Sequence, residues 1–110
     1  MPNINIDQLG TNILTAMKGK LLGHWNAVEP FVKTEAQKLA ICGAQIVEGQ
    51  ANGTITPEQA KILEKMQANS AQAVLTAVET VGMIAAQDAI NAGLQVLETA
   101  VNGAIGFAFL

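Results

Sequence analysis

The segment Ala51-Asn52-Gly53-Thr54-Ile55-Thr56-Pro57-Glu58-Gln59 decides how this chain folds. Asn-Gly is a strong turn dipeptide, because both residues tolerate a positive φ. Thr56 suits a helix N-cap, Pro57 the first helical position, and Gln59 the third position of a capping box. These cues predict a turn at residues 51–55 and a helix that begins at Thr56.

Two long helical arms are predicted, one on each side of this turn. The second spans about residues 56–107, because no proline follows Pro57 and helix-forming residues dominate. The first spans about residues 6–50 and contains Pro30, which lacks a backbone donor, so we expect a kink or break that leaves segments of about 6–28 and 30–50. A three-helix arrangement is the alternative. The expected fold is all-α: a single domain formed by a long antiparallel helical hairpin.

Small residues recur at helical spacing along the second arm. They fall within an eleven-residue repeat that starts at Asn69, the period of a hendecad coiled coil whose helices run nearly straight. Coincidence in an alanine-rich chain is the alternative. A stripe of small residues lets two helices approach closely. We therefore expect copies of the chain to meet through Gly82, Ala86, Ala89, Gly93, Ala100 and Ala104, together with Phe107 and Phe109.

The polar side of the same arm is narrow and consists mostly of amides. A helix that faces water usually carries a broad charged face. The scarcity of charge predicts that this arm is covered by more than one neighbour, in a larger helical oligomer whose buried amides are satisfied across subunits. This polar stripe comprises Gln87, Asn91, Gln95, Glu98 and Asn102.

Composition and charge exclude several classes of partner. The net charge is −3, with six lysines and no arginine, so we expect no nucleic-acid partner. The longest charge-free runs, 66–78 and 99–110, fall short of the roughly 20 residues that a membrane span requires. The segment Met1-Pro2-Asn3-Ile4 has neither the cationic lead nor the apolar core of a Sec signal, so we expect a cytoplasmic or particle-associated location. Contact with a membrane interface is left open.

No residue pattern predicts catalysis or ligand binding. His24 has no acid three or four residues away that could complete a metal site. Cys42 lies in an apolar stretch and is expected to be a packed thiol. Trp25 is expected to anchor the first arm. We therefore predict a protein that is not an enzyme and that uses no metal, cofactor or small-molecule substrate.

Three acids are isolated in the second arm. Glu79, Asp88 and Glu98 are nine and ten positions apart, too distant to act as a carboxylate pair on one bond. Burial between subunits would raise their pKa values and make assembly sensitive to acid.

These features favour a non-enzymatic structural protein that assembles with itself, for example as a component of a virus-like or phage-like particle. One alternative is a membrane-active or pore-forming hairpin, with the apolar segment 103–110 as its insertion tip. A second alternative is a soluble dimeric four-helix adaptor.

Overall fold

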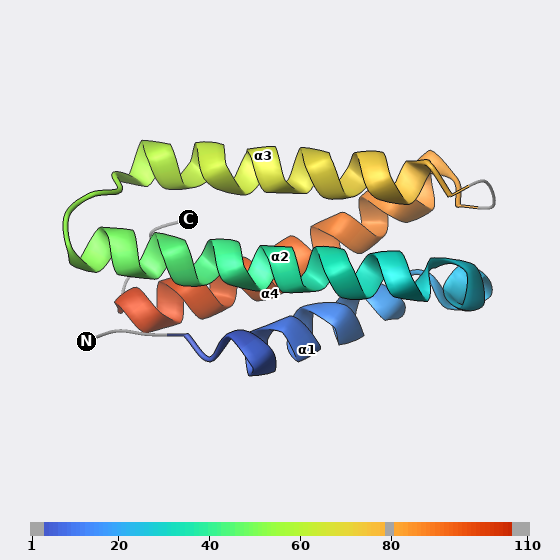
Figure 1. Cartoon of the computed structure of the whole chain (residues 1–110), viewed down its shortest axis with the longest axis horizontal. Coiled ribbons are helices and arrows are strands. Elements are labelled where there is room, and N and C mark those ends of the chain that lie inside the picture. The colour runs from blue at the N-terminus through green and yellow to red at the C-terminus, as the bar shows by residue number, and fades with distance from the viewer. Residues whose placement is uncertain (1–3, 79–80, 107–110) are drawn as a thin grey trace.

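The computed structural model describes residues 4–78 and 81–106, and these residues form four packed α-helices without a strand (Figure 1). The helices are α1 (Ile6–Lys18), α2 (Trp25–Ala51), α3 (Pro57–Thr76) and α4 (Met83–Ile105), and a short 3-10 helix, η1 (Leu22–His24), precedes α2. The expectation of an all-α fold is confirmed. Within the described residues, no helix combines the length and apolar character needed to cross a membrane.

The turn between α2 and α3 forms as the sequence predicts. Gly53 has a φ of +79°, and the side chain of Asn52 accepts a hydrogen bond of 3.1 Å from the Thr54 amide. The Gln59 amide donates to Thr56 Oγ1 at 3.2 Å, while the Thr56 amide donates to Gln59 Oε1 at 2.9 Å. This reciprocal pair is the predicted capping box. The capping box fixes the start of α3, and the turn makes α3 run antiparallel to α2 (Figure 1).

The prediction of one continuous helix over 56–107 is wrong. The chain forms α3, ends it at Thr76, and begins α4 at Met83. The intervening sequence contains three β-branched residues and ends in Gly82, and these residue types favour helix less than the alanine and glutamine around them. Breaking the helix here also buries Val81, which is 5% exposed, and lets α4 fold back on the bundle. The burial of apolar side chains in the bundle therefore outweighs the tendency of residues 56–107 to form one continuous helix.

The predicted break near Pro30 is also wrong. Pro30 lies inside α2, in its second turn, and the break falls earlier, between Lys18 and the start of η1. The hydrogen bond that a proline cannot donate would have ended on the Asn26 carbonyl. Asn26 and Pro30 are both exposed, so water can donate a hydrogen bond to the Asn26 carbonyl in place of the missing backbone N–H. The result is four helices rather than the hairpin or the three-helix alternative.

The apolar core lies among α1, α2 and α4, with α3 covering α2 from the other side. In Figure 1, α4 starts beside the end of α3 and crosses behind α2 to reach α1 at the opposite end of the molecule. At Gly93 of α4, an added Cβ would lie 3.1 Å from Met17 Cγ and 3.3 Å from Ile13 Cγ2 of α1. At Gly43 of α2, an added Cβ would overlap the Leu97 side chain of α4. Both glycines thus allow close packing within one chain.

Candidate functional site

The predicted interface stripe is divided between the core and the surface. Ala86 and Ala89 are buried in the core beside Gly93, whereas Gly82 is exposed with open space around it. Ala100 and Ala104 are half-buried, and Phe107 and Phe109 lie outside the described residues. At Gly93, the close contacts are with α1 of the same chain.

The polar stripe of α4 is also divided. Gln87 and Asn91 are exposed, and Gln87 Nε2 donates to Asn91 Oδ1 at 3.2 Å. These two residues and half-buried Glu98 face a groove beside α3. Gln95 is exposed on the other side of α4, where it faces α1. Asn102 is half-buried near the end of the helix.

The groove between α3 and α4 has a volume of about 410 Å³. Its floor is apolar, and carboxamides from both helices line it. Glu64 and Glu98 lie in the same groove. The remaining lining residues are Lys61, Lys65, Ala68, Asn69, Gln72, Gln87, Ile90, Asn91 and Leu94.

Glu64 and Glu98 form a carboxyl pair that joins α3 to α4. Glu64 is only 8% exposed. Burial raises the pKa of Glu64 from 4.5 to about 8, with further contributions from its hydrogen bond with Glu98 and from the negative charge of Glu98. The raised pKa of Glu64 favours its protonated form near neutral pH.

Sequence reasoning identified Glu98 but missed Glu64. The available signal was the position of Glu64 four residues from Ala60 and four from Ala68, on the face of α3 that packs inward. An acid on such a stripe of small residues is a candidate for a buried carboxyl group. Within one chain, burial and the neighbouring Glu98 raise the pKa of Glu64 of α3.

Cys42 of α2 is a buried free thiol, as expected. Burial raises its pKa, and the nearby charge of Glu64 raises it further. A thiol that stays neutral at physiological pH is a poor nucleophile. Cys42 is therefore a packed residue of the apolar core.

Trp25 connects the end of α1 to the start of α2. Its indole Nε1 donates to Glu29 Oε2 at 3.1 Å, and Lys18 Nζ lies 5.0 Å from the ring centroid. This cation–π contact stabilises the turn by about 0.5–1 kcal/mol at such a surface site. His24 is half-buried in η1 beside it.

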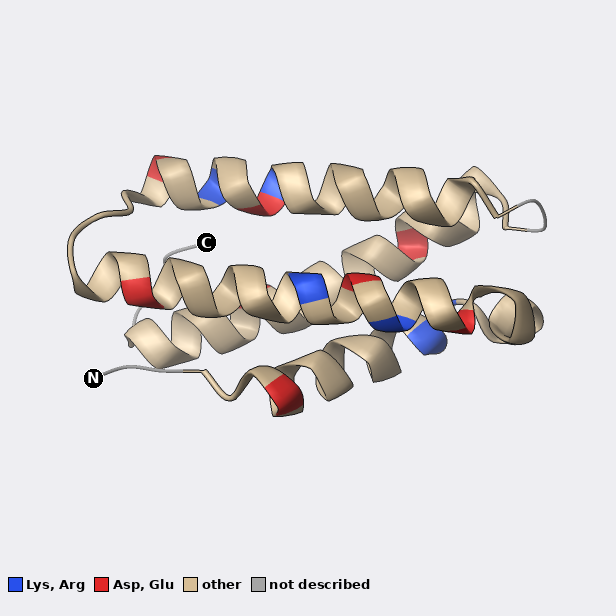
Figure 2. Ribbon diagram, viewed as in Figure 1, with Lys and Arg blue, Asp and Glu red and all other residues tan. Residues whose placement is uncertain are grey.

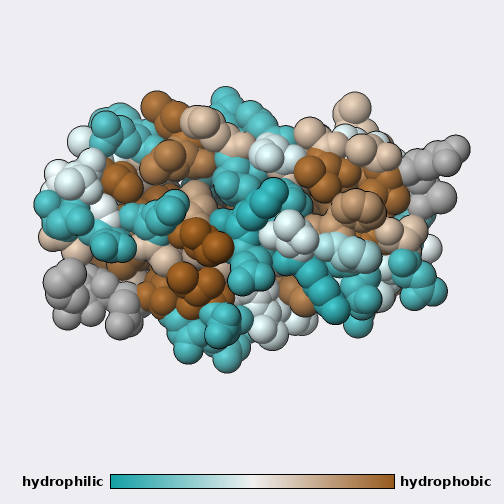
Figure 3. Space-filling view, in the orientation of Figure 1, coloured by the Kyte–Doolittle hydropathy of each residue, from teal (hydrophilic) through white to brown (hydrophobic). Residues whose placement is uncertain are grey.

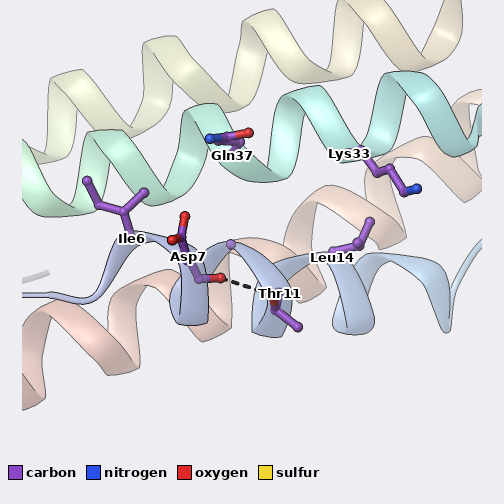
Figure 4. A pocket seen from close by; sticks show the side chains of 7 residues that line it. Ile6, Asp7, Thr11, Leu14, Lys33 and Gln37 are labelled. Carbon is purple, nitrogen blue, oxygen red and sulfur yellow. Dashed lines mark hydrogen bonds between the residues drawn. The ribbon is translucent and has the colours of Figure 1, made fainter.

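A second hollow, of about 290 Å³, lies between α1 and α2 (Figure 4). Figure 4 shows Asp7 and Thr11 on α1 beneath Gln37 of α2, with Thr11 Oγ1 donating to the Asp7 carbonyl at 3.0 Å. Lys33 stands at the far end of the hollow from Asp7. This arrangement brings no nucleophile to a base and has no carboxyl pair.

Glu35 of α2 is buried, with 1% of its surface exposed. Its Oε2 lies 3.3 Å from Lys38 Nζ, whereas its Oε1 has no hydrogen-bond partner in the described structure. A buried carboxylate that is half satisfied costs stability. Neither hollow described above includes Glu35 in its lining.

The outward face of α3 carries large apolar side chains, whereas a helix at a protein surface usually directs such side chains inward. The helix directs small residues and Glu64 inward, while Ile62, Leu63 and Met66 are 58%, 38% and 63% exposed. Figure 2 shows that the charges of α3 are confined to its first half, and in Figure 3 apolar residues appear along the edge that α3 forms. Around these three side chains, the exposed face consists of the uncharged residues Gln59, Ser70 and Ala73. We call Gln59, Ile62, Leu63, Met66, Ser70 and Ala73 the α3 outer face.

Among the described residues, no three histidine, cysteine, aspartate or glutamate side chains are grouped so that they could hold a metal ion. The geometry therefore offers two features of interest, the carboxyl pair in the α3–α4 groove and the α3 outer face. Comparison of the chain with protein-family models, curated proteins and solved structures gives no match.

Proposed function

We propose that this chain is a non-enzymatic structural protein that assembles with copies of itself through the α3 outer face. The observation that supports this most directly is the exposure of Ile62 and Met66 on a helix that packs inward through alanines. An exposed row of large apolar side chains on a small soluble domain marks an interaction surface more often than a solvated one. Full burial of each such side chain contributes about 1.5–3 kcal/mol relative to full exposure.

The charges beside the α3 outer face favour a second copy as the occupant. Glu58 and Lys65 are seven residues apart and therefore lie on the same side of α3, with Ile62 between them. When two copies of α3 pack antiparallel about a two-fold axis, Glu58 of each copy faces Lys65 of the other. Such an isologous contact pairs opposite charges and covers the apolar side chains together.

The test is the mass of the protein as a function of concentration, measured by sedimentation up to about 1 mM, since a small contact of this kind gives weak affinity. We expect a reversible dimer or larger species for the wild type and a monomer for Ile62→Glu. The matched control is Ile84→Glu, which adds the same charge at a residue that is 79% exposed on α4, away from the α3 outer face. A wild-type protein that stays monomeric throughout, or a control that dissociates equally, would refute the proposal.

The measured stoichiometry also separates the two kinds of assembly. A closed dimer supports a soluble helical adaptor, whereas an open series of oligomers supports a repeating shell or tube in a virus-like particle. The second outcome requires another contact surface besides the α3 outer face, because a two-fold contact closes on itself. The small-residue positions Ala100 and Ala104, which are half-buried, are the predicted contribution of α4 to it.

A second candidate function is contact with a membrane interface through one end of the bundle. Leu22, Met83 and Ile84 are 69%, 70% and 79% exposed, more than the other large apolar residues described. The α1–α2 turn and the start of α4 lie at the same end of the molecule (Figure 1). Trp25 and Lys18 are close to Leu22 in sequence, and both residue types are common at membrane surfaces.

Flotation with vesicles tests this second function. We expect the wild type to float with phosphatidylcholine vesicles that contain phosphatidylserine, and we expect Ile84→Glu to reduce the floated fraction at least fivefold. Ile62→Glu is the control and should float as the wild type does. If the wild type stays at the bottom of the gradient at low and physiological salt, the membrane function is excluded.

A further inference from the structure

We propose that the groove between α3 and α4 binds the segment 107–110 of a second copy of the chain. The groove has a volume of about 410 Å³, and its apolar lining consists of Ala68, Ile90 and Leu94. Ile90 and Leu94 are one turn apart on α4, which places them about 6 Å apart along the helix axis. The groove therefore offers two large aliphatic side chains in a row, with an alanine of the facing helix beside them.

The polar lining of the groove suits the backbone of a peptide. Carboxamides stand on both sides, from Asn69 and Gln72 on α3 and from Gln87 and Asn91 on α4. A carboxamide both donates and accepts hydrogen bonds, and each residue of a peptide other than proline presents one backbone donor and one acceptor. An apolar strip flanked by carboxamides thus fits an uncharged peptide whose side chains are apolar.

The segment that follows Gly106 has this chemistry. It reads Phe-Ala-Phe-Leu, carries no charged side chain and lies outside the described residues. In an extended peptide, side chains two positions apart point to the same side and are about 6.5 Å apart. Phe107 and Phe109 of a peptide bound in this way match the spacing of Ile90 and Leu94. Both phenylalanines are also residues that the sequence predicts at an interface between copies.

The segment has to come from another copy, because that of the same chain is too short to reach the apolar lining. Gly106 follows Leu94 by 12 positions and Ile90 by 16, roughly 18 and 24 Å along α4. An extended chain spans at most about 3.3–3.6 Å per residue, so Phe109 stays within about 11 Å of Gly106. Phe107 is nearer still.

A contact between the end of one copy and the groove of the next is heterologous, and its repetition gives an open series of copies. It therefore supplies the contact that a repeating assembly needs in addition to the α3 outer face. The inference rests on the proposed function, because a contact through four residues is weak by itself. Two copies that are paired through α3 carry two segments and two grooves, so pairs bind one another more tightly than single copies do.

Sedimentation of the full chain up to about 1 mM provides the first test. We expect the wild type to form species larger than the dimer, and we expect the double variant Phe107→Asp, Phe109→Asp to stop at the dimer. Leu94→Glu should also stop there, because it places a charge in the apolar lining. Gln95→Glu is the matched control: it adds the same charge one position later, on the other side of α4, and should assemble as the wild type does.

The outcomes separate this contact from the pairing through α3. A wild type that stops at the dimer refutes the groove contact and leaves the α3 pairing standing. Larger species that persist in the double variant also refute the groove contact. A wild type that stays monomeric refutes the α3 pairing, and the groove is then tested by a peptide.

The peptide test needs no pairing through α3. The probe is the tetrapeptide Phe-Ala-Phe-Leu, acetylated and amidated at its ends. It is added to the ¹⁵N-labelled full chain that carries Ile62→Glu, Phe107→Asp and Phe109→Asp, which presents an intact groove and no competing segment. We expect saturable shifts in the side-chain amide signals of Gln72 and Asn91, with a dissociation constant in the millimolar range.

Two controls make the titration specific. Adding Leu94→Glu to the labelled chain should weaken binding about tenfold or more, because a charge replaces an apolar side chain of the lining. The peptide Asp-Ala-Asp-Leu should cause no shift. The inference is refuted if Phe-Ala-Phe-Leu leaves Gln72 and Asn91 unshifted, or if it shifts only Asn12 and Gln95, which line a separate hollow between α1 and α4.

Discussion

Replacing Gly93 with leucine is expected to lower the free energy of unfolding by about 2–4 kcal/mol, because the site has no space for a side chain. A Cβ at this position would already lie 3.1 Å from Met17 Cγ and 3.3 Å from Ile13 Cγ2. The remaining atoms of leucine would have to displace α1 from α4 or force buried side chains away from their preferred rotamers. Chemical denaturation followed by circular dichroism measures the change.

Gly82 provides the matched control. It belongs to the same predicted stripe, but nothing lies within 4 Å of a Cβ added there, and its φ of −72° suits any residue. We expect Gly82→Leu to change the free energy of unfolding by less than about 1 kcal/mol. If both variants lost a similar amount of unfolding free energy, the two glycines would have to be equally crowded. That result would contradict the packing of Gly93 against α1.

The second large effect is the dependence of stability on pH. The folded protein raises the pKa of Glu64 from 4.5 to about 8, so between these values the folded state holds a proton that the unfolded state has lost. Stability therefore falls as the pH rises across this window, and the contribution is complete below 4.5 and lost above about 8. Because one pKa unit corresponds to about 1.4 kcal/mol and the pair is coupled, we expect a loss on the order of 2–4 kcal/mol between pH 5 and pH 9.

Denaturation of the wild type and Glu64→Gln at a series of pH values measures this effect. The two proteins should have similar stability at pH 5, and the variant should be the more stable one at pH 9. Glu58→Gln removes an exposed acid from the first turn of α3 and should leave the slope of the wild type unchanged. A wild-type stability that is constant from pH 5 to pH 9 would show that Glu64 is not held as a neutral acid in the folded state.

Local chemistry made the α2–α3 turn predictable. Asn52 and Gly53 form the turn, and Thr56 and Gln59 cap the next helix through atoms only three residues apart. Such interactions depend little on the remainder of the chain. The helical class follows from composition in the same way, since alanine, glutamine, leucine and lysine favour helix wherever they are placed.

The candidate site was only partly predictable. The polar stripe of α4 pointed to Glu98, because amides and an isolated acid on an otherwise apolar helix indicate a buried polar contact. Its partner Glu64 lies 34 positions earlier and is brought to Glu98 by the reversal of the chain after Thr76. The sequence predicted that α3 and α4 form one helix, and in one helix Glu64 and Glu98 would lie far apart. No local pattern could therefore show that the two residues are neighbours.

By itself, then, the sequence determined the helical class, the turn at Asn52-Gly53 and the start of α3, because each depends on interactions within a few residues. Only the tertiary structure decided where the two arms break. A continuous second arm would have left Val81 and much of α4 without the core that α1 and α2 provide, and burial of that surface outweighs a few residues of helix propensity. The same folding back placed Gly93 against α1 and Glu64 beside Glu98.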